Sequence, residues 1–278
     1  MKIGTKEFDF RTSCYLMGIL NVTPDSFSDG GKWNSIDAAL FHTEQMIHEG
    51  AAIIDIGGES ARPGHQPVSE EEEIERVLPY IEAIKQRFDI PISIDTYKAK
   101  TAKEAFLAGA DLLNDIWGLK GSKEIAEIAA KFQRPCCLMH NRNREQQPYV
   151  RLMDEVLSDL RESLQIAYDA GIKKENLLLD PGIGFGKTTE ENLIVLNHLE
   201  RLLELDYPIL LGTSRKSVIG NTLDLPTDQR VEGTIATTVM GVLKGCRIFR
   251  VHDVKENYRA MKMAEAIINH QEKDNAFS

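Results

Sequence analysis

The chain has 278 residues, 42% of them hydrophobic, and carries a formal net charge of −10 at pH 7. This length fits one domain with a large core, so we expect a single domain over residues 1–278. The charge argues against nucleic acid and membrane surfaces as partners, because both attract clustered positive charge, and the sequence has no stretch typical of a signal peptide or membrane span. We therefore expect a cytoplasmic protein.

Apolar runs alternate with helical patterns along the chain, after an N-terminal piece, residues 2–11, that we expect to form a small hairpin. The runs are residues 15–20, 52–56, 90–94, 110–113, 135–139, 177–179, 207–211 and 247–251. Strand followed by helix, repeated eight times over about 250 residues, predicts an α/β protein with a single (β/α)8 TIM barrel. A doubly wound open sheet is the alternative.

Two helical segments carry specific expectations. Ser69, followed by Glu70, Glu71 and Glu72, predicts a capping box at the start of a helix, with the acids at the positive end of its dipole. Residues 231–243 are small or apolar nearly all round. Such a helix needs cover on both sides, so we expect this one to contact a second subunit and the protein to be a homodimer.

Polar or glycine-rich residues follow the predicted strands. They include Asn21, the loop 57–64, Asp95, Asn114, Asp115, His140, Asp180, Ser214, Lys216, Arg250 and His252. In a barrel all the strand ends meet on one face, which is where active sites of this fold lie. Alone, an acid here could be a cap or an ion-pair partner, a histidine could belong to the core, and Lys216 could be a surface residue or a Schiff-base nucleophile. Their convergence predicts one active site.

The predicted site contains two kinds of polar group. Asp95, Asn114 and Asp180 supply acceptors and an amide donor beside apolar strand ends, which suits a planar heterocycle that presents N–H groups. The other kind consists of donors that suit a phosphate or diphosphate, because charge-assisted hydrogen bonds bind anions well. These donors are Asn21, Arg62, Arg250 and His252. A heterocyclic substrate with a diphosphate tail is implied.

Five motifs in this order resemble the dihydropteroate synthase family. They are NVTPDSFSDG at 21–30, GGESARPG at 57–64, DPGIGFGK at 180–187, SRKS at 214–217 and RVHD at 250–253. The resemblance extends from the first strand to the last helix. Two alternatives share the pterin pocket: a barrel that transfers a methyl group from a reduced folate, which has no evident need for Arg62 and His252, and a non-catalytic paralogue, whose loops should show decay.

The resemblance implies a transferase of folate biosynthesis and a sulfonamide target. This family joins 6-hydroxymethyl-7,8-dihydropterin diphosphate to 4-aminobenzoate with Mg²⁺, giving 7,8-dihydropteroate and pyrophosphate; a dissociative route through a pterin-methylene cation is expected. The implied catalytic residues are Asp95, Asp180, Lys216 and Arg250, and those that hold the pterin are Asp95, Asn114, Ile116, Met139, Asp180, Phe185, Gly212, Lys216 and Arg250.

The resemblance also implies residues for the other groups of the reaction. Those for the diphosphate are Asn21, Arg62, Arg250 and His252, with Asn21 also a ligand of Mg²⁺. Those for 4-aminobenzoate are Phe27, Ala61, Pro63, Lys216 and Ser217, with its carboxylate at the N-terminus of the helix that begins near Ser217. Position 61 departs from the family, which often has Thr there, so a hydroxyl near the aminobenzoate is missing.

Overall fold

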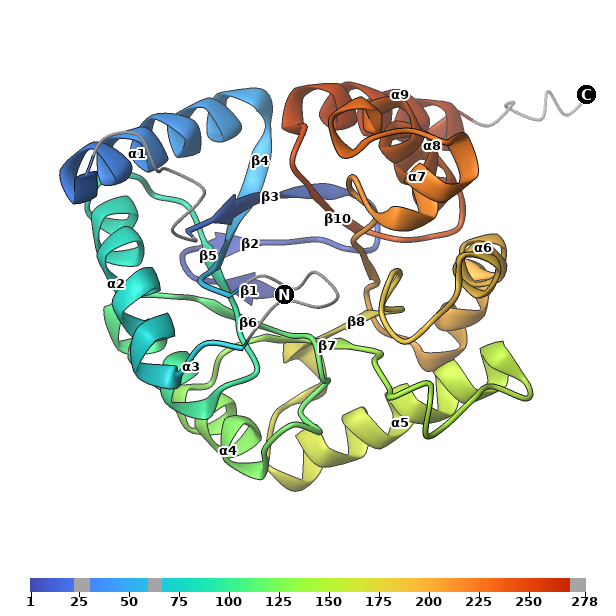
Figure 1. The fold of residues 1–278 in the computed structure, drawn as a ribbon, viewed down its shortest axis with the longest axis horizontal. Helices are drawn as coiled ribbons and strands as arrows, with labels where there is room; N and C mark the ends of the chain where they lie inside the picture. The colour runs from blue at the N-terminus through green and yellow to red at the C-terminus, as the bar shows by residue number, and fades with distance from the viewer. Residues whose placement is uncertain (23–30, 60–66, 271–278) are drawn as a thin grey trace, which may run out of the picture.

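The computed structural model describes residues 1–22, 31–59 and 67–270. Within these residues, eight parallel strands form a barrel inside a ring of helices (Figure 1). The strands are β3 (Tyr15–Asn21), β4 (Ala51–Gly57), β5 (Ile92–Asp95), β6 (Leu112–Asp115), β7 (Cys136–Met139), β8 (Leu177–Asp180), β9 (Leu210–Leu211) and β10 (Ile248–Val251).

Backbone pairing closes the barrel. The strand order is β8-β7-β6-β5-β4-β3-β10-β9, and an isolated parallel bridge joins Leu179 to Ile209 across the remaining gap. The Leu179 N–H donates to the Pro208 carbonyl at 3.0 Å in the same gap. The (β/α)8 prediction is therefore confirmed, and the open-sheet alternative is not.

Helices cover the outside of the barrel. They are α1 (Gly31–Glu49), α2 (Glu70–Arg87), α3 (Ala99–Ala108), α4 (Lys123–Phe132), α5 (Leu152–Asp169), α6 (Thr189–Asn197), α7 (Ser217–Leu223), α8 (Val231–Leu243) and α9 (Val254–Asn269), with 3-10 turns at η2 (Lys174–Asn176), η3 (Leu199–Leu205) and η4 (Thr227–Gln229). Ser69 caps α2, its Oγ accepting the Glu72 N–H at 3.1 Å, but only this half of the predicted capping box is present, because the Glu72 carboxylate accepts a hydrogen bond from Arg76. The helix α8 covers the predicted range.

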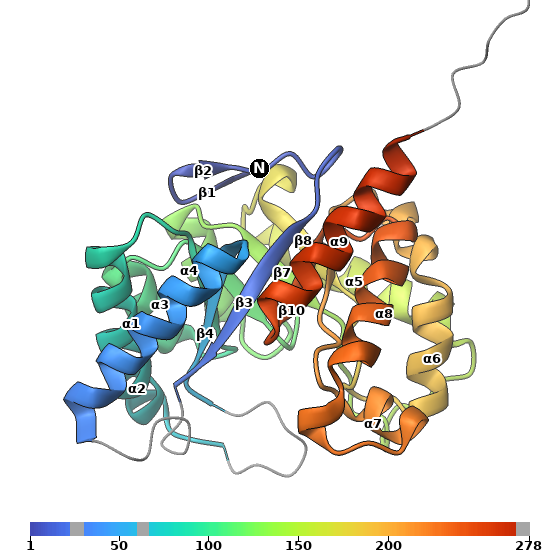
Figure 2. The same cartoon turned by 90° about the horizontal axis from the view of Figure 1, so that it is seen from above.

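The predicted N-terminal hairpin is present as β1 (Lys2–Ile3) and β2 (Lys6–Glu7). It lies across the end of the barrel at which the strands begin (Figures 1 and 2). Its Ile3 and the following Phe8 and Phe10 are buried against the apolar residues of the barrel interior. The interior residues they join are Met17, Ile53, Leu112, Cys137, Leu178, Leu210 and Ile248. The hairpin therefore plugs this end of the barrel.

The strands differ from the predicted runs at their ends. β5 and β6 start later than predicted and extend through Asp95 and Asp115, because backbone pairing continues regardless of side-chain polarity. The seventh strand is shorter than predicted, only Leu210–Leu211, since Pro208 has no N–H to donate to a ladder.

In the described part of the chain, none of the helices is long and apolar enough to cross a membrane. The cytoplasmic location stays a prediction.

Candidate active site

Strand register gathers four of the strand ends into one layer. Asn21 pairs with Gly57, Gly57 with Asp95, and Asp95 with Asn114, each as Cα partners on neighbouring strands. A Cβ on Gly57 would lie 3.5 Å from the Asp95 Cβ and 3.9 Å from the Asn21 Oδ1. The absent side chain therefore leaves space between Asn21 and Asp95.

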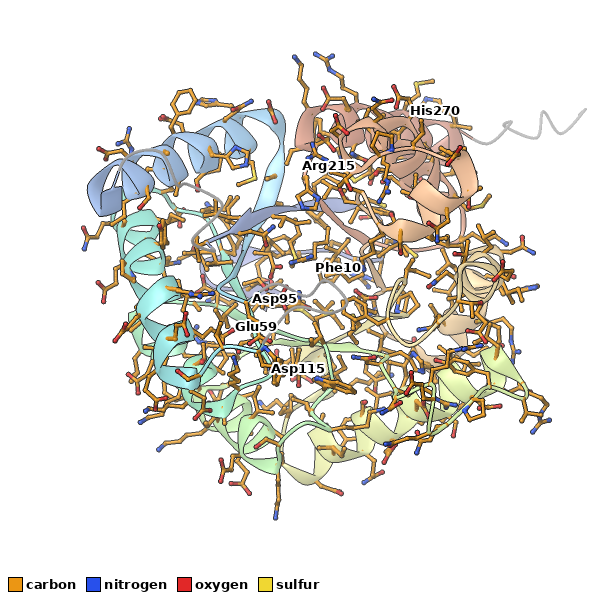
Figure 3. All side chains as sticks on the ribbon, viewed as in Figure 1. Phe10, Glu59, Asp95, Asp115, Arg215 and His270 are labelled. Atoms are coloured by element: carbon orange, nitrogen blue, oxygen red, sulfur yellow. The ribbon has the colours of Figure 1, made fainter. Side chains whose placement is uncertain are left out.

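Alternation along each strand explains why these side chains face the barrel interior. Successive residues of a strand point to opposite faces, so residues two apart share a face. Asn114 lies two residues beyond Leu112, Asp180 two beyond Leu178, and Arg250 two beyond Ile248, and all three apolar residues belong to the interior cluster. The polar layer therefore lies next to the apolar interior cluster, on the side where the strands end. Figure 3 shows Asp95 well inside the ring of helices.

Arg250 is bound by two carboxylates from across the barrel. Its Nε donates to Asp55 Oδ2 at 2.5 Å and its Nη2 to Asp95 Oδ2 at 2.7 Å, while Asn114 Nδ2 donates to Asp55 Oδ2 at 3.4 Å. These contacts hold the guanidinium at the centre of the polar layer. Charge-assisted hydrogen bonds of this kind also fix its orientation.

Asp55 was missed by the sequence analysis, because it stands inside the apolar run 52–56 instead of at its end. The signal was its phase: it is two residues from Ile53, which faces the interior. Asp55 is fully buried, and its Oδ1 has no hydrogen-bond partner among the described residues; nor does the Oγ of Ser93, its Cα partner on β5. A buried polar atom without a partner normally marks a place for water or a ligand.

Burial raises the pKa of both predicted catalytic acids. The pKa of Asp95 rises to about 7, because burial disfavours its charge, although the Arg250 charge opposes this. Burial also raises the pKa of Asp180, with Lys216 opposing, and Asp180 Oδ1 accepts the Gly182 N–H at 2.7 Å. A ligand that brings N–H donors or positive charge would stabilise the ionised form of such carboxylates.

Lys216 lies beside Asp180 at the other wall of the site. Its Nζ donates to the Ile183 carbonyl at 2.6 Å and lies 4.7 Å from the centroid of the Phe185 ring. Burial lowers the Lys216 pKa to about 8. A Cβ on Gly212 would lie 3.8 Å from each of Asp180 Oδ2, Lys216 Nζ and the Arg250 Cβ. The structure thus brings Asp180, Lys216 and Arg250 together around Gly212, as the sequence predicts.

A buried network supports the glycine-rich loop after β8 from outside the site. Lys187 Nζ donates to the carbonyls of Gly182 at 3.0 Å and Phe185 at 3.1 Å, and lies 2.8 Å from His140 Nδ1. His140 Nε2 lies 3.0 Å from Asp159 Oδ2. Burial lowers the pKa of Lys187 to about 7 and of His140 to about 4. His140 is therefore part of the loop's support.

Glu59 connects the glycine-rich loop after β4 to the loop that follows Asp95. It accepts hydrogen bonds from Lys98 Nζ at 2.5 Å, the Tyr97 hydroxyl at 3.0 Å and the Val68 N–H at 3.2 Å. Its carboxylate therefore links Val68 to the segment that follows β5. Sequence reasoning missed it, because only the tertiary structure reveals its partners.

Four of the other predicted residues lie within the described part of the chain. His252 follows β10, with its Nδ1 2.9 Å from Ser214 Oγ, and Ser217 is the exposed first residue of α7. Met139 is buried at the end of β7, and Ile116 is half-buried just after β6. Four predicted site residues lie outside the described part of the chain. They are Phe27, Ala61, Arg62 and Pro63.

The described residues fit a magnesium ion only if the substrate supplies most of its ligands. No group of three or more His, Cys, Asp or Glu residues in the described part of the chain is arranged to hold a metal. Asn21, at the exposed end of β3, offers one amide oxygen beside the polar layer. Magnesium keeps few protein ligands when phosphate oxygens are present, so this donor set suits a metal bound with a diphosphate.

The barrel and its acceptors at the strand ends are typical of an enzyme that binds a flat ring bearing N–H groups. The sequence profile of the family described as "Pterin binding enzyme" matches residues 17–252 and agrees with this class of protein. A dihydropteroate synthase of Clostridium beijerinckii is 62% identical over 269 residues, 96% of this chain and 99% of the relative. The Bacillus subtilis enzyme of that name is 54% identical over 260 residues, 94% and 90% of the two chains.

Solved structures of dihydropteroate synthases are also similar to this chain. The dihydropteroate synthase of Clostridium difficile, crystallised in the presence of pteroic acid, superposes with a TM-score of 0.92 at 50% identity, covering 95% of this chain and all of that one. The Yersinia pestis enzyme in complex with a sulfonamide drug gives 0.90 at 45% identity, covering 97% and 99%. The chain therefore belongs to the dihydropteroate synthase family.

Proposed function

We propose that this chain joins 6-hydroxymethyl-7,8-dihydropterin diphosphate to 4-aminobenzoate, giving 7,8-dihydropteroate and pyrophosphate. The observation that carries the proposal is the cluster of Asp95, Asp180, Lys216 and Arg250 in one buried layer of the barrel. Support also comes from the relatives: the Clostridium difficile structure was obtained with pteroic acid, and a Xanthomonas albilineans synthase, 40% identical, with 4-aminobenzoic acid.

The pterin binds against the polar layer. A buried carboxylate can accept two parallel N–H bonds from the aminopyrimidinone edge, as it does from a guanidinium, so Asp180 and Asp95 suit the N–H-bearing edges of the ring. Lys216 supplies a donor to a ring acceptor, Arg250 stacks on the face of the ring, and Gly212 leaves room for it. The remaining residues of this pocket are Asn114, Ile116, Met139 and Phe185.

The reaction proceeds by loss of the diphosphate before the amine adds. The C–O bond breaks with both electrons leaving on the diphosphate oxygen, and the electron-rich dihydropterin delocalises the positive charge of its methylene carbon. Asp95 and Asp180 stabilise that charge as it forms, since fixed carboxylates in a buried site act strongly on developing charge. The aniline nitrogen then bonds to the carbon and loses a proton.

The leaving diphosphate is held by donors at the rim of the site. Arg250, His252 and Arg62 suit this role, because cationic and N–H donors bind phosphate oxygens. Asn21 would hold Mg²⁺ together with the diphosphate. When bound, Mg²⁺ neutralises negative charge on the leaving group.

The 4-aminobenzoate lies on the solvent side of the pterin. Its carboxylate would contact Ser217 at the start of α7, with Lys216 alongside, and its ring would contact Phe27, Ala61 and Pro63. The observation in support is the position of α7, which begins at Ser217, next to the lysine whose Nζ borders Phe185. Arg62→Ala should raise the KM for 4-aminobenzoate more than that for the pterin substrate.

The test is an assay with purified protein, the dihydropterin diphosphate, 4-aminobenzoate and Mg²⁺. Pyrophosphate release that depends on the amine, with dihydropteroate as product, is expected. Absence of product, together with tight pterin binding, would contradict the proposal in favour of a non-catalytic paralogue. Loss of the methyl group from a methylated reduced folate would instead favour a methyltransferase.

We also propose that two copies of the chain form a homodimer through α8 and α9. These helices lie side by side on the outside of the barrel (Figures 1 and 2). They expose large apolar side chains: Met240 and Leu243 on α8, and Met263 and Ile267 on α9. Sedimentation should give a dimer for the native chain and a monomer for Leu243→Asp. A monomeric native chain would overturn this proposal.

A further inference from the structure

Ser214, in the loop after β9, contacts His252 at two points. Its Oγ accepts the His252 backbone N–H at 3.1 Å and lies 2.9 Å from Nδ1 of the same residue's imidazole. Ser214 is only 6% exposed. One hydroxyl group therefore connects the loop that carries Lys216 to both the backbone and the ring of the residue just beyond β10.

The hydroxyl's single proton decides which nitrogen of the ring is protonated. A serine hydroxyl donates one hydrogen bond and accepts up to two. Ser214 Oγ already accepts the His252 backbone N–H, and its other contact among the described residues is with Nδ1. If Nδ1 carried a proton, the buried hydroxyl proton would have no acceptor there, which is costly. The hydroxyl therefore donates to Nδ1, and the neutral ring carries its proton on Nε2.

We infer that Ser214 is a positioning residue that holds the His252 imidazole in one orientation, with its proton on Nε2. The use of this proton rests on the proposed function: an Nε2–H can donate to a phosphate oxygen of the diphosphate, whereas a bare Nε2 would repel it. A hydrogen bond to one ring nitrogen commonly sets the chemistry of the other in this way.

A second pair of residues keeps this contact in place. Arg215 Nε donates to Asp253 Oδ2 at 3.0 Å, one residue further along both segments. Arg215 has a left-handed backbone, φ 58°, and its carbonyl accepts a hydrogen bond from Arg230 Nη1 at 2.9 Å. Figure 3 shows Arg215 beside the C-terminal helices. Two consecutive links therefore fix the position of Ser214 relative to His252.

The direct test is nuclear magnetic resonance of ¹⁵N-histidine-labelled native protein, without ligand, at about pH 8, where imidazoles are mostly neutral. Long-range proton-nitrogen correlations distinguish the two tautomers, and the signal that disappears in His252→Gln identifies His252. We expect the native ring to carry its proton on Nε2. A proton on Nδ1 would overturn the inference, whatever the activity of the protein.

Variants of the same loop test the role of the hydroxyl. Ser214→Ala should lower the fraction of His252 rings that carry their proton on Nε2 and should bind inorganic pyrophosphate with Mg²⁺ about threefold to tenfold more weakly, as expected for one hydrogen bond. Ser214→Thr should restore the native spectrum and affinity. The control is Thr213→Val, which removes the 2.7 Å contact with Thr237 Oγ1 in the same loop and should leave the His252 spectrum unchanged.

The outcomes separate the inference from the proposed function. An unchanged tautomer and affinity in Ser214→Ala would overturn the positioning role, as would equal effects in Thr213→Val. If Ser214→Ala does not fold, the native spectrum and Ser214→Thr still decide. An Nε2–H ring in a protein that releases no pyrophosphate in the synthase assay would leave the assignment of the ring intact and reject the proposed reaction.

Discussion

The two ends of the barrel use the same strands for opposite purposes. At the end where strands begin, inward side chains such as Leu112, Leu178 and Ile248 meet the hairpin in an apolar cluster. Two residues further along the same strands, the inward positions hold Asn114, Asp180 and Arg250. At the first end the inward side chains are apolar, whereas at the other end the inward carboxylates of Asp55, Asp95 and Asp180 lie close to the cations of Arg250 and Lys216.

The two ends therefore contribute differently to stability and activity. Burial of apolar surface stabilises the fold, whereas burial of charge costs free energy unless every charge finds a partner. The raised pKa values of Asp95 and Asp180 indicate that burying their charges costs free energy at the end of the barrel where the strands end. A ligand that brings N–H donors or positive charge would reduce this cost. Substitutions at the apolar end should therefore affect unfolding, and those at the polar end should affect turnover.

The largest effect is expected for Asp180→Asn, which keeps the shape of the side chain and removes its charge. Turnover should fall by about 10²–10³-fold, as for loss of one electrostatic contact to a transition state. The melting temperature should hardly change, since burial already disfavours this charge. Steady-state kinetics and circular dichroism would measure both. Near-normal turnover would contradict the cation-stabilising role.

An acid at the other end provides the matched control. Asp111 Oδ2 accepts hydrogen bonds from Lys85 Nζ at 2.9 Å and the Ile92 N–H at 3.0 Å, near the start of β5. Asp111→Asn should lower the free energy of unfolding and leave turnover of the folded protein unchanged. Loss of turnover in Asp111→Asn together with loss of stability in Asp180→Asn would contradict this division of roles between the two ends.

Leu178→Ala tests the apolar end. Leu178 is fully buried in the interior cluster, so its truncation should cost about 2–5 kcal/mol of unfolding free energy through lost burial and a cavity. Urea unfolding measures this. Leu107→Ala, at a site that is 62% exposed, should change stability by less than about 0.5 kcal/mol. Similar losses of stability in both variants would show that the interior cluster contributes no more to stability than an exposed leucine does.

The pH dependence of pterin binding tests Asp95, whose pKa burial raises from 3.8 to about 7. The ionised carboxylate is the form that accepts N–H bonds, so affinity for a pterin analogue should fall by up to about tenfold per pH unit below 7. Stability should respond in the opposite sense. Since the native state binds this proton more tightly than the unfolded chain, the contribution of Asp95 to stability decreases as pH rises from 3.8 to 7.

Calorimetric titration between pH 5 and 8 would measure the affinity. The matched variant is Asp95→Asn, which should bind more weakly and should lose the dependence on pH in this range. An acid limb that persists in Asp95→Asn would assign the titration to another group.

The smallest effect is expected for Lys187→Met, which removes the donor shared by the Gly182 and Phe185 carbonyls. The loop after β8 should loosen and the KM for the pterin substrate should rise by about tenfold or less, as for one charged hydrogen bond. Lys174→Met, which removes an exposed ion pair with Asp206, is the control and should leave the KM unchanged. Equal KM values in all three proteins would show that the loop keeps its shape without Lys187.

Local sequence patterns were enough to predict the kind of fold and most of the polar strand ends. Strand and helix alternation is a local property, so the barrel and the positions of Asp95, Asn114, Asp180 and Arg250 at strand ends were predictable. Strand limits were less predictable. β5 extends through Asp95 because its backbone pairs with β6 beyond the apolar run, which side-chain polarity does not reveal. The seventh strand is shortened to two residues because Pro208 has no N–H to donate.

Which polar groups contact each other depends on the folded chain as a whole. Asp55 and Arg250 are 195 residues apart in the chain and form a 2.5 Å contact because closure of the barrel brings β4 and β10 to either side of β3. The pairing of Ser214 with His252 and of Lys187 with His140 likewise depends on neighbouring loops at one end of a closed barrel. Local patterns fix which face a side chain takes, whereas its partners depend on register and closure, which involve the whole chain.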